Sequence, residues 1–263
     1  MRSVVGLLVM AVMLAGLRVD LSVRSAAAME NGTGEAVLTG SLNRQVTQGT
    51  DDAEEAIASG ITTLTSSDLE FVNDPDGKID QVVGMRFLNI DIPNGATIVN
   101  SYLIFTVDET SAIPTSLTIY GEAADNAATF AATLGNITQR APTTALVQWA
   151  ALPEWAELNT TQQTPSLNTL LQEIVRRPGW QAKNALAFMI RGNGRRTAFA
   201  YDGTKAKAPR LFVEWRLDPT PTPTATATAT ASATAAATAT ATVPPTQTAQ
   251  PTATATATVP PTF

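Results

Sequence analysis

The sequence predicts an all-β protein: an antiparallel jelly-roll β-sandwich with one amphipathic helix, followed by a disordered tail rich in Thr, Ala and Pro. Three observations lead to this fold class. Apolar and polar residues alternate with a period of two in several short stretches between about Glu35 and Trp215. Turn sequences separate these stretches, and one segment has the periodicity of a helix. Short strands separated by turns at this spacing are typical of an antiparallel sandwich.

Four segments carry the strand pattern most clearly. Val83, Met85 and Phe87 alternate with smaller or polar residues. In the next segment one face is predicted to carry Val99, Ser101, Leu103, Phe105 and Val107, and the other Asn100, Tyr102, Ile104 and Thr106. The continuous apolar run from Ala185 to Ile190 suits a strand buried on both faces. The last strand is predicted around Leu211, Val213 and Trp215.

Turns and a helix complete the predicted domain. Turns are expected at 74–77, 93–95 and 191–194, which are rich in Gly, Pro, Asn and Asp. The helix is indicated by apolar residues at helical spacing: Leu167, Leu170, Leu171, Ile174 and Val175. Thr164 is expected to cap it, Pro165 to lie in its first turn, and Pro178-Gly179 to end it. A weaker helical turn is expected around 126–132.

The chain divides into three parts: a signal peptide at 1–28, a β-sandwich domain at 29–218 and a low-complexity stalk or linker at 219–263. The signal prediction is based on Arg2, the apolar run at 4–16 and the Ala cluster at 26–28. The tail alternates Thr and Ala with scattered Pro, a composition that cannot form a packed core. We therefore expect a secreted or cell-surface protein with no membrane insertion after signal cleavage.

Composition narrows the possible chemistry. The chain has no His and no Cys, which excludes Ser-His-Asp and Cys-His catalysis and His/Cys zinc sites. Its net charge of −6 argues against nucleic acid as a partner. Carboxylate-dependent glycan cleavage stays open, because two suitably spaced carboxylates suffice for it. The candidates are Asp51, Asp52, Glu54, Glu55, Glu122 and Asp202.

A cluster of acidic residues predicts a structural Ca²⁺ site. The run Asp51-Asp52-Ala53-Glu54-Glu55 is expected to lie near Asp202, because the first and last strands of a jelly roll are neighbours. Glu122 and Asp125 follow another strand and are expected at the same end. Oxygen ligands from several loops suit Ca²⁺. The alternative is a solvated acidic edge that keeps an exposed strand from pairing.

Aromatic residues supply the candidate ligand-binding surface: Trp155, Tyr201, Trp149 and Tyr120. Flat rings can stack on the apolar faces of sugars, so an exposed set would favour polysaccharide. The alternative is that tryptophans pack the helix onto the sandwich, which we expect for Trp180 and Trp215. The basic, glycine-rich segment 191–196 is expected to be a solvated hairpin turn, with binding of an acidic glycan or phosphate as the alternative.

Several stretches within 51–215 resemble a secreted bacterial accessory module. They include VVGMRFLNIDIPNGATIVNSYLIFTVDET and AFAYDGTKAKAPRLFVEW, and the "RF" strand is followed by an I-P-x-G-A-x-I strand pair between Arg86 and Leu103. This layout is similar to that of DNRLRE-type carbohydrate-binding domains. The resemblance implies a jelly-roll sandwich with a non-catalytic role.

Three functions follow from these observations. The first is a secreted, non-catalytic module, with a possible structural Ca²⁺, that binds extracellular polysaccharide or a cell-surface polymer. The second is a structural or adhesion protein without a small-molecule site. The third is a carboxylate-dependent enzyme acting on glycans.

Overall fold

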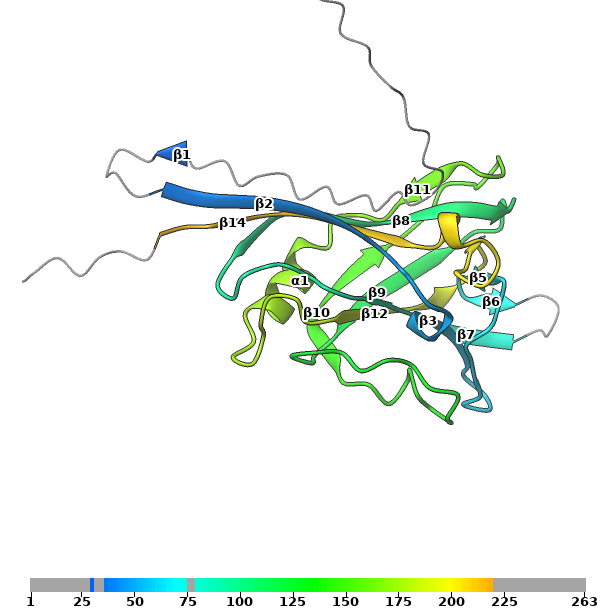
Figure 1. Cartoon of the computed structure of the whole chain (residues 1–263). Helices are drawn as coiled ribbons and strands as arrows, with labels where there is room; N and C mark the ends of the chain where they lie inside the picture. Colours follow the sequence, from blue (N-terminus) through cyan, green and yellow to red (C-terminus); the bar gives the residue numbers. More distant parts are fainter. Residues whose placement is uncertain (1–28, 31–35, 75–78, 220–263) are drawn as a thin grey trace, which may run out of the picture. The chain divides into compact units, whose positions relative to one another are not determined.

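The computed structural model describes residues 29–30, 36–74 and 79–219. The predicted signal peptide, most of the predicted turn at 74–77 and the predicted tail beyond residue 219 lie outside these residues. Within them the chain forms two antiparallel seven-stranded sheets, two short 3-10 turns and one α-helix (Figure 1). The all-β sandwich predicted from the sequence is therefore confirmed.

Sheet 1 has the strand order β1-β2-β14-β8-β13-β5, and β11 also pairs with β8. Its strands are β1 (Met29–Glu30), β2 (Ala36–Gln45), β5 (Asp68–Glu70), β8 (Thr97–Glu109), β11 (Thr161–Gln163), β13 (Thr197–Phe199) and β14 (Arg210–Leu217). The long strands from the two ends of the domain, β2 and β14, lie side by side, and all of β14 pairs with β2 from Leu38 to Gln45 (Figure 1). This pairing is the one expected of a jelly roll.

Sheet 2 has the order β10-β9-β12-β7-β3-β4, and β6 also pairs with β7. Its strands are β3 (Asp52–Ala56), β4 (Thr62–Thr63), β6 (Asn73–Asp74), β7 (Ile79–Phe87), β9 (Ser116–Glu122), β10 (Pro142–Trp149) and β12 (Leu186–Asn193). In sheet 1 the strands β2, β14, β8 and β11 are neighbours in this order, and in sheet 2 the neighbours are β7, β12, β9 and β10. The chain thus winds between the two sheets as the jelly roll does, with β3 and β4 added at one edge.

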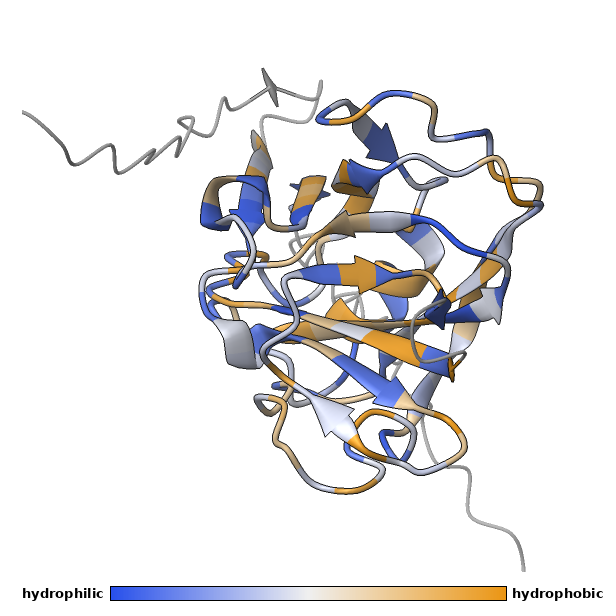
Figure 2. Ribbon diagram, turned by 90° about the vertical axis from the view of Figure 1, so that its right-hand side faces the viewer, coloured by the Kyte–Doolittle hydropathy of each residue, from blue (hydrophilic) through white to orange (hydrophobic). Residues whose placement is uncertain are grey.

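The main core fills the space between the sheets. Inward-facing residues of both sheets meet there, including Leu103 and Phe105 of β8, Phe188 of β12, and Leu211 and Val213 of β14. Hydrophobic and hydrophilic residues are interleaved along the strands in Figure 2. This alternation is the pattern from which the strands were predicted.

A second, smaller core covers the outer face of sheet 2. Phe130 and Ile137, in the long connection between β9 and β10, pack against Ala53, Val82 and Met189 of three different strands. A Cβ atom at Gly84 would lie only 2.7 Å from the Phe130 ring, so the strand needs glycine at this point. Because this connection covers the sheet, every residue from 185 to 190 is buried, as predicted. The helical turn expected at 126–132 does not form, and the segment is an irregular cover.

The helix α1 (Asn168–Val175) packs against β8 of sheet 1 and against β9 and β10 of sheet 2, and so lies between the two layers (Figure 1). The five apolar residues that predicted it are all buried. The expected cap is wrong: the hydroxyl of Thr164 accepts the backbone N–H of Leu103 at 3.0 Å and does not bond to the helix. Among the described residues, no helix has the length and apolar character needed to cross a bilayer.

The predicted face of β8 changes at one point. Glu214 pairs with Asn100 and Trp215 with Ile98, so Val99 is an extra residue in a β-bulge. The bulge turns Val99 outward, where its side chain is 53% exposed, and turns Ile98 inward. The prediction that Val99 shares the buried face of Leu103 is therefore wrong.

Candidate functional site

The acidic run lies in β3, which pairs with β7 on one side and with the short edge strand β4 on the other, and in the turn before it. The side chains of Asp51, Asp52, Glu54 and Glu55 are all buried. The alternative of a solvated acidic edge is therefore wrong. Successive residues of a strand point to opposite faces, so these carboxylates do not converge on one point. Asp51 and Glu55 meet the cover of sheet 2, whereas Asp52 and Glu54 meet sheet 1 and its loops.

On the cover side each carboxylate has its own partners. Asp51 forms an ion pair with Arg86 at 2.7 Å. Glu55 accepts the backbone N–H groups of Ile137 and Thr138 at 2.5 and 3.1 Å, and also the Thr138 hydroxyl. These contacts attach the long connection between β9 and β10 to the strand beneath it.

On the other side, Asp52 accepts the backbone N–H of Tyr201 at 2.7 Å. The first and last strands therefore bring the acidic run to Tyr201 and Asp202, as the sequence predicted. Burial is the main cause that raises the pKa of Asp52 to about 7, with smaller contributions from Asp202 and Asp51. Asp202 itself is exposed.

Glu54 meets Glu70 of β5. The backbone N–H of Glu70 donates to Glu54 Oε1 at 2.8 Å, and Gln81 Nε2 donates to the same oxygen at 2.8 Å. Burial, reinforced by the neighbouring Glu70 side chain, raises the pKa of Glu54 to about 9. A glycosidase needs two carboxylates that are separated across the scissile bond. This pair instead lies in direct contact, and the Glu54 side chain is shielded from solvent.

Two further candidates for the metal are held by arginines. Glu122 pairs with Arg140, and Asp125 with Arg177, each at 2.7 Å. In the part of the chain that the structure describes, no group of three or more acidic residues is arranged to hold a metal ion. The seven candidates are thus not brought together in this arrangement, and a calcium site formed by them would require several carboxylates to exchange their present partners for the ion.

The two tryptophans proposed for sugar stacking belong to the core. Trp155 is completely buried and Trp149 is 6% exposed. Trp155 contacts Phe71 edge-on, and Trp149 stacks on Phe105 at 6.2 Å. They therefore cannot form an exposed platform, and this part of the prediction is wrong. Trp180 and Trp215 are buried as expected.

Neither tyrosine of the predicted set supplies a platform with them. Tyr201 is half-buried, packs against the main core and lies under the Lys205 ammonium at 5.2 Å. Tyr120 is half-buried against the smaller core on the other sheet. Three of the four predicted aromatic residues thus belong to or pack against the main core, and Tyr120 lies against the smaller one.

The basic segment 191–196 is also different from the prediction. It is not a hairpin, because β12 lies in sheet 2 and β13 in sheet 1. Arg196 is only 1% exposed. Its guanidinium donates to backbone carbonyls, including those of Ile113 at 2.7 Å and Pro153 at 2.8 Å. Arg196 thus stabilises three loops from the inside instead of facing a ligand.

The outer face of sheet 1 carries an aromatic pair that was not among the residues predicted to bind a ligand. Tyr102 of β8 and Phe212 of β14 are directly opposite in register. Their rings stack at 5.0 Å with 23° between the planes, and both remain partly exposed. The available signal was a large aromatic residue at an outward position in each of two strands.

Polar side chains surround this pair. Register and alternation place Asn43, Asn100, Gln163 and Glu214 on the same face. The Asn100 amide donates to Glu214 at 3.3 Å. We call this surface, made of the aromatic pair and these four residues, the aromatic face. It is a ridge of two rings flanked by amide and carboxylate groups.

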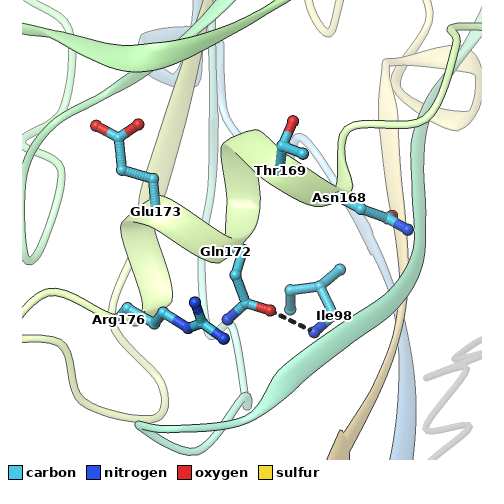
Figure 3. Close-up of a pocket in the computed structure, with 6 residues that line it drawn as sticks. All are labelled: Ile98, Asn168, Thr169, Gln172, Glu173 and Arg176. Carbon is cyan, nitrogen blue, oxygen red and sulfur yellow. Dashed lines mark hydrogen bonds between the residues drawn. The ribbon is translucent and has the colours of Figure 1, made fainter.

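A groove lies between α1 and the start of β8 (Figure 3). It encloses about 450 Å³ and is lined by Ile98, Asn168, Thr169, Gln172, Glu173 and Arg176. The Gln172 amide accepts the Ile98 backbone N–H at 2.9 Å and donates to the Ala96 carbonyl at 2.8 Å. One wall of the groove is thus fixed to the backbone of the sheet.

The sequence matches no protein-family model, and the search of curated proteins found no significant match. The resemblance to carbohydrate-binding domains therefore stays a prediction.

Proposed function

We propose that this chain is a non-catalytic extracellular module that binds polysaccharide or a related cell-surface polymer through the aromatic face. The observation that carries the proposal is the stacked Tyr102–Phe212 pair on the outer face of sheet 1. A pyranose ring has an apolar C–H face and a rim of hydroxyl groups. The two rings offer an apolar surface for the first, and the surrounding amides offer hydrogen bonds to the second.

The shape of the surface supports a polymer over a small molecule. The aromatic face spans the three neighbouring strands β2, β14 and β8, together with β11. Such a surface contacts several units of a chain without enclosing any of them. The predicted signal peptide and the predicted Thr/Ala/Pro stalk support an extracellular setting for this contact.

The test is binding of the full chain to a panel of soluble polysaccharides, read as a rise in melting temperature. A ligand that binds only the native state stabilises it by mass action. We expect Tyr102→Ala and Phe212→Ala each to weaken the binding about tenfold, which corresponds to about 1.4 kcal/mol. Trp155→Phe is the control, because Trp155 is buried and should not affect binding.

Each variant must first show a cooperative melt, so that loss of binding is not loss of fold. Wild-type affinity in both aromatic-face variants would overturn the location of the site. Absence of binding to any polysaccharide in the panel would favour the structural or adhesion role over the binding module.

A further inference from the structure

Arg176, the C-cap residue of α1, is exposed beside the groove, and no acidic side chain among the described residues pairs with it. Glu173 precedes it by three residues, a spacing that normally lets the two side chains pair on a helix. Here both Glu173 oxygens are taken by β10: they accept the backbone N–H groups of Thr144 and Ala145 at 2.8 and 2.7 Å. Figure 3 shows the Glu173 carboxylate directed away from Arg176.

Two other arginines of the chain are paired with carboxylates. Arg177 pairs with Asp125, and Arg140 with Glu122. Within the described ranges the Arg176 guanidinium has no hydrogen-bond or ion-pair partner. All five of its N–H donors are therefore available to a ligand in the groove.

Two side-chain amides of the groove, those of Asn168 and Gln172, also keep a donor once their internal bonds are counted. Asn168 accepts the Ser101 hydroxyl and donates one amide hydrogen to the Val99 carbonyl, each at 2.8 Å. Gln172 likewise accepts the backbone N–H of Ile98 and donates one amide hydrogen to the Ala96 carbonyl. Each amide keeps one free N–H. The groove thus offers fixed donors to a ligand rich in acceptors.

We infer that this groove is a second binding site, which takes a carboxylate carried on an otherwise neutral glycan, with Arg176 holding the carboxylate. A guanidinium binds a carboxylate through two parallel hydrogen bonds, which suits one acidic group. The net charge of −6 disfavours a densely charged polyanion. A sparsely carboxylated glycan meets both conditions, because its single acidic group suits the guanidinium and its neutral units are not repelled by the acidic protein.

The inference relies on the proposed function only in taking the ligand to be a sugar, and the site is separate from the aromatic face. The test is an NMR titration of the ¹⁵N-labelled full chain with methyl β-D-glucuronide and, in parallel, with methyl β-D-glucoside. The two probes differ only in the carboxylate. We expect the glucuronide to shift the Arg176 Nε–Hε resonance with a Kd on the order of millimolar, and the glucoside to leave it unmoved.

Two variants separate the site from general attraction of anions. Arg176→Ala should abolish the glucuronide response in the Asn168 and Gln172 side-chain amides. Arg191→Ala, which removes another exposed arginine on β12, should preserve it. Equal responses to the two sugars, an unchanged response in the Arg176 variant, or a response to sodium acetate equal to that of the glucuronide would each overturn the inference.

Failure here is distinguishable from failure of the proposed function. Tyr102→Ala should leave the glucuronide response of the groove intact, because the aromatic face is a different surface. If the aromatic face binds no polysaccharide while the groove still distinguishes the two sugars, only the proposed function is overturned.

Discussion

Glu54 of β3 in sheet 2 and Glu70 of β5 in sheet 1 form a contacting pair of carboxyl groups between the sheets, with Gln81 donating to both. Gln81 Nε2 lies 2.8 Å from Glu54 Oε1 and 3.1 Å from Glu70 Oε2. Two ionised carboxylates that share one donor in this way would repel one another. The raised pKa values of both residues are consistent with a proton held between them, and burial is the largest cause for each.

This pair predicts that the protein loses stability as the pH rises. Burial and Glu70 raise the pKa of Glu54 from 4.5 to about 9, so the folded state retains a proton that the unfolded state has released. The stabilisation is complete below pH 4.5 and is lost as the pH rises toward about 9. Asp52 adds a similar loss that ends near pH 7, where its raised pKa lies. Melting curves between pH 7 and 9 therefore report mainly on the glutamate pair.

Glu54→Gln is the matching variant. A glutamine keeps an oxygen for the Glu70 and Gln81 N–H groups and carries permanent N–H donors in place of the proton. We expect its melting temperature to vary less than that of the wild type between pH 7 and 9. Glu214→Gln, at an exposed position, should retain the wild-type slope. An equally steep fall in Glu54→Gln would show that the pair does not hold the proton.

Removing Arg196 should destabilise the protein strongly. Its guanidinium donates to the carbonyls of Ile113 and Pro153 and to the Thr115 hydroxyl, and it is almost completely buried. Arg196→Met leaves several buried acceptors without donors, at about 1–3 kcal/mol each, so we expect a total loss of roughly 3 kcal/mol or more. The measurement is the free energy of unfolding in urea.

Arg196→Lys should fall between the wild type and the methionine variant, because one ammonium group cannot replace the planar fork. The control is Arg191→Met, at an exposed position, which should change stability by less than about 0.5 kcal/mol. A loss in Arg196→Met no larger than that of the control would contradict the internal role of this arginine.

Glu55 should control the opening of the connection that covers sheet 2. It accepts the backbone N–H groups of Ile137 and Thr138, both in that connection. In Glu55→Ala we expect these two amides to exchange with deuterium about 10–100-fold faster, since each lost bond costs about 1–3 kcal/mol locally. Amides of β12 such as Met189 serve as the internal reference. Uniform acceleration of both groups would indicate global destabilisation instead.

The sequence predicted those features of the fold that depend on periodicity. The strands around Val83, Leu103 and Val213, and the helix around Leu170, are where the alternation and the helical spacing put them. The exception at Val99 comes from a β-bulge, which is set by the pairing of β8 with β14 and cannot be read from one strand. The predicted capping role of Thr164 was wrong for a similar reason: its hydroxyl accepts a hydrogen bond from the backbone N–H of Leu103, a strand residue far away in the sequence.

The candidate site was harder to predict because the role of each residue depends on the side chains and backbone groups that contact it from distant parts of the sequence. A run of four acids in five residues indicates a solvated or metal-bound segment unless each acid finds a donor, and here Arg86, Tyr201, Gln81 and Thr138 supply donors from distant positions. The sequence did not indicate that Trp155 is buried, because Pro153 and Glu154 before it are residues typical of an exposed loop, and they are indeed exposed. Tyr102 was placed correctly on the outer face of its strand, but its stacking on Phe212 required the register between two strands.

Chelation tests the predicted calcium site directly, and the contacts of the acidic residues determine the expected result. Ca²⁺ takes six to eight oxygen ligands. To provide them, Asp51 would have to leave Arg86, and Glu55 the amides of Ile137 and Thr138. We therefore expect the melting temperature of the full chain to be the same in EDTA and in CaCl₂. A fall in EDTA that Ca²⁺ reverses and Mg²⁺ does not would show that these carboxylates exchange their present partners for the ion.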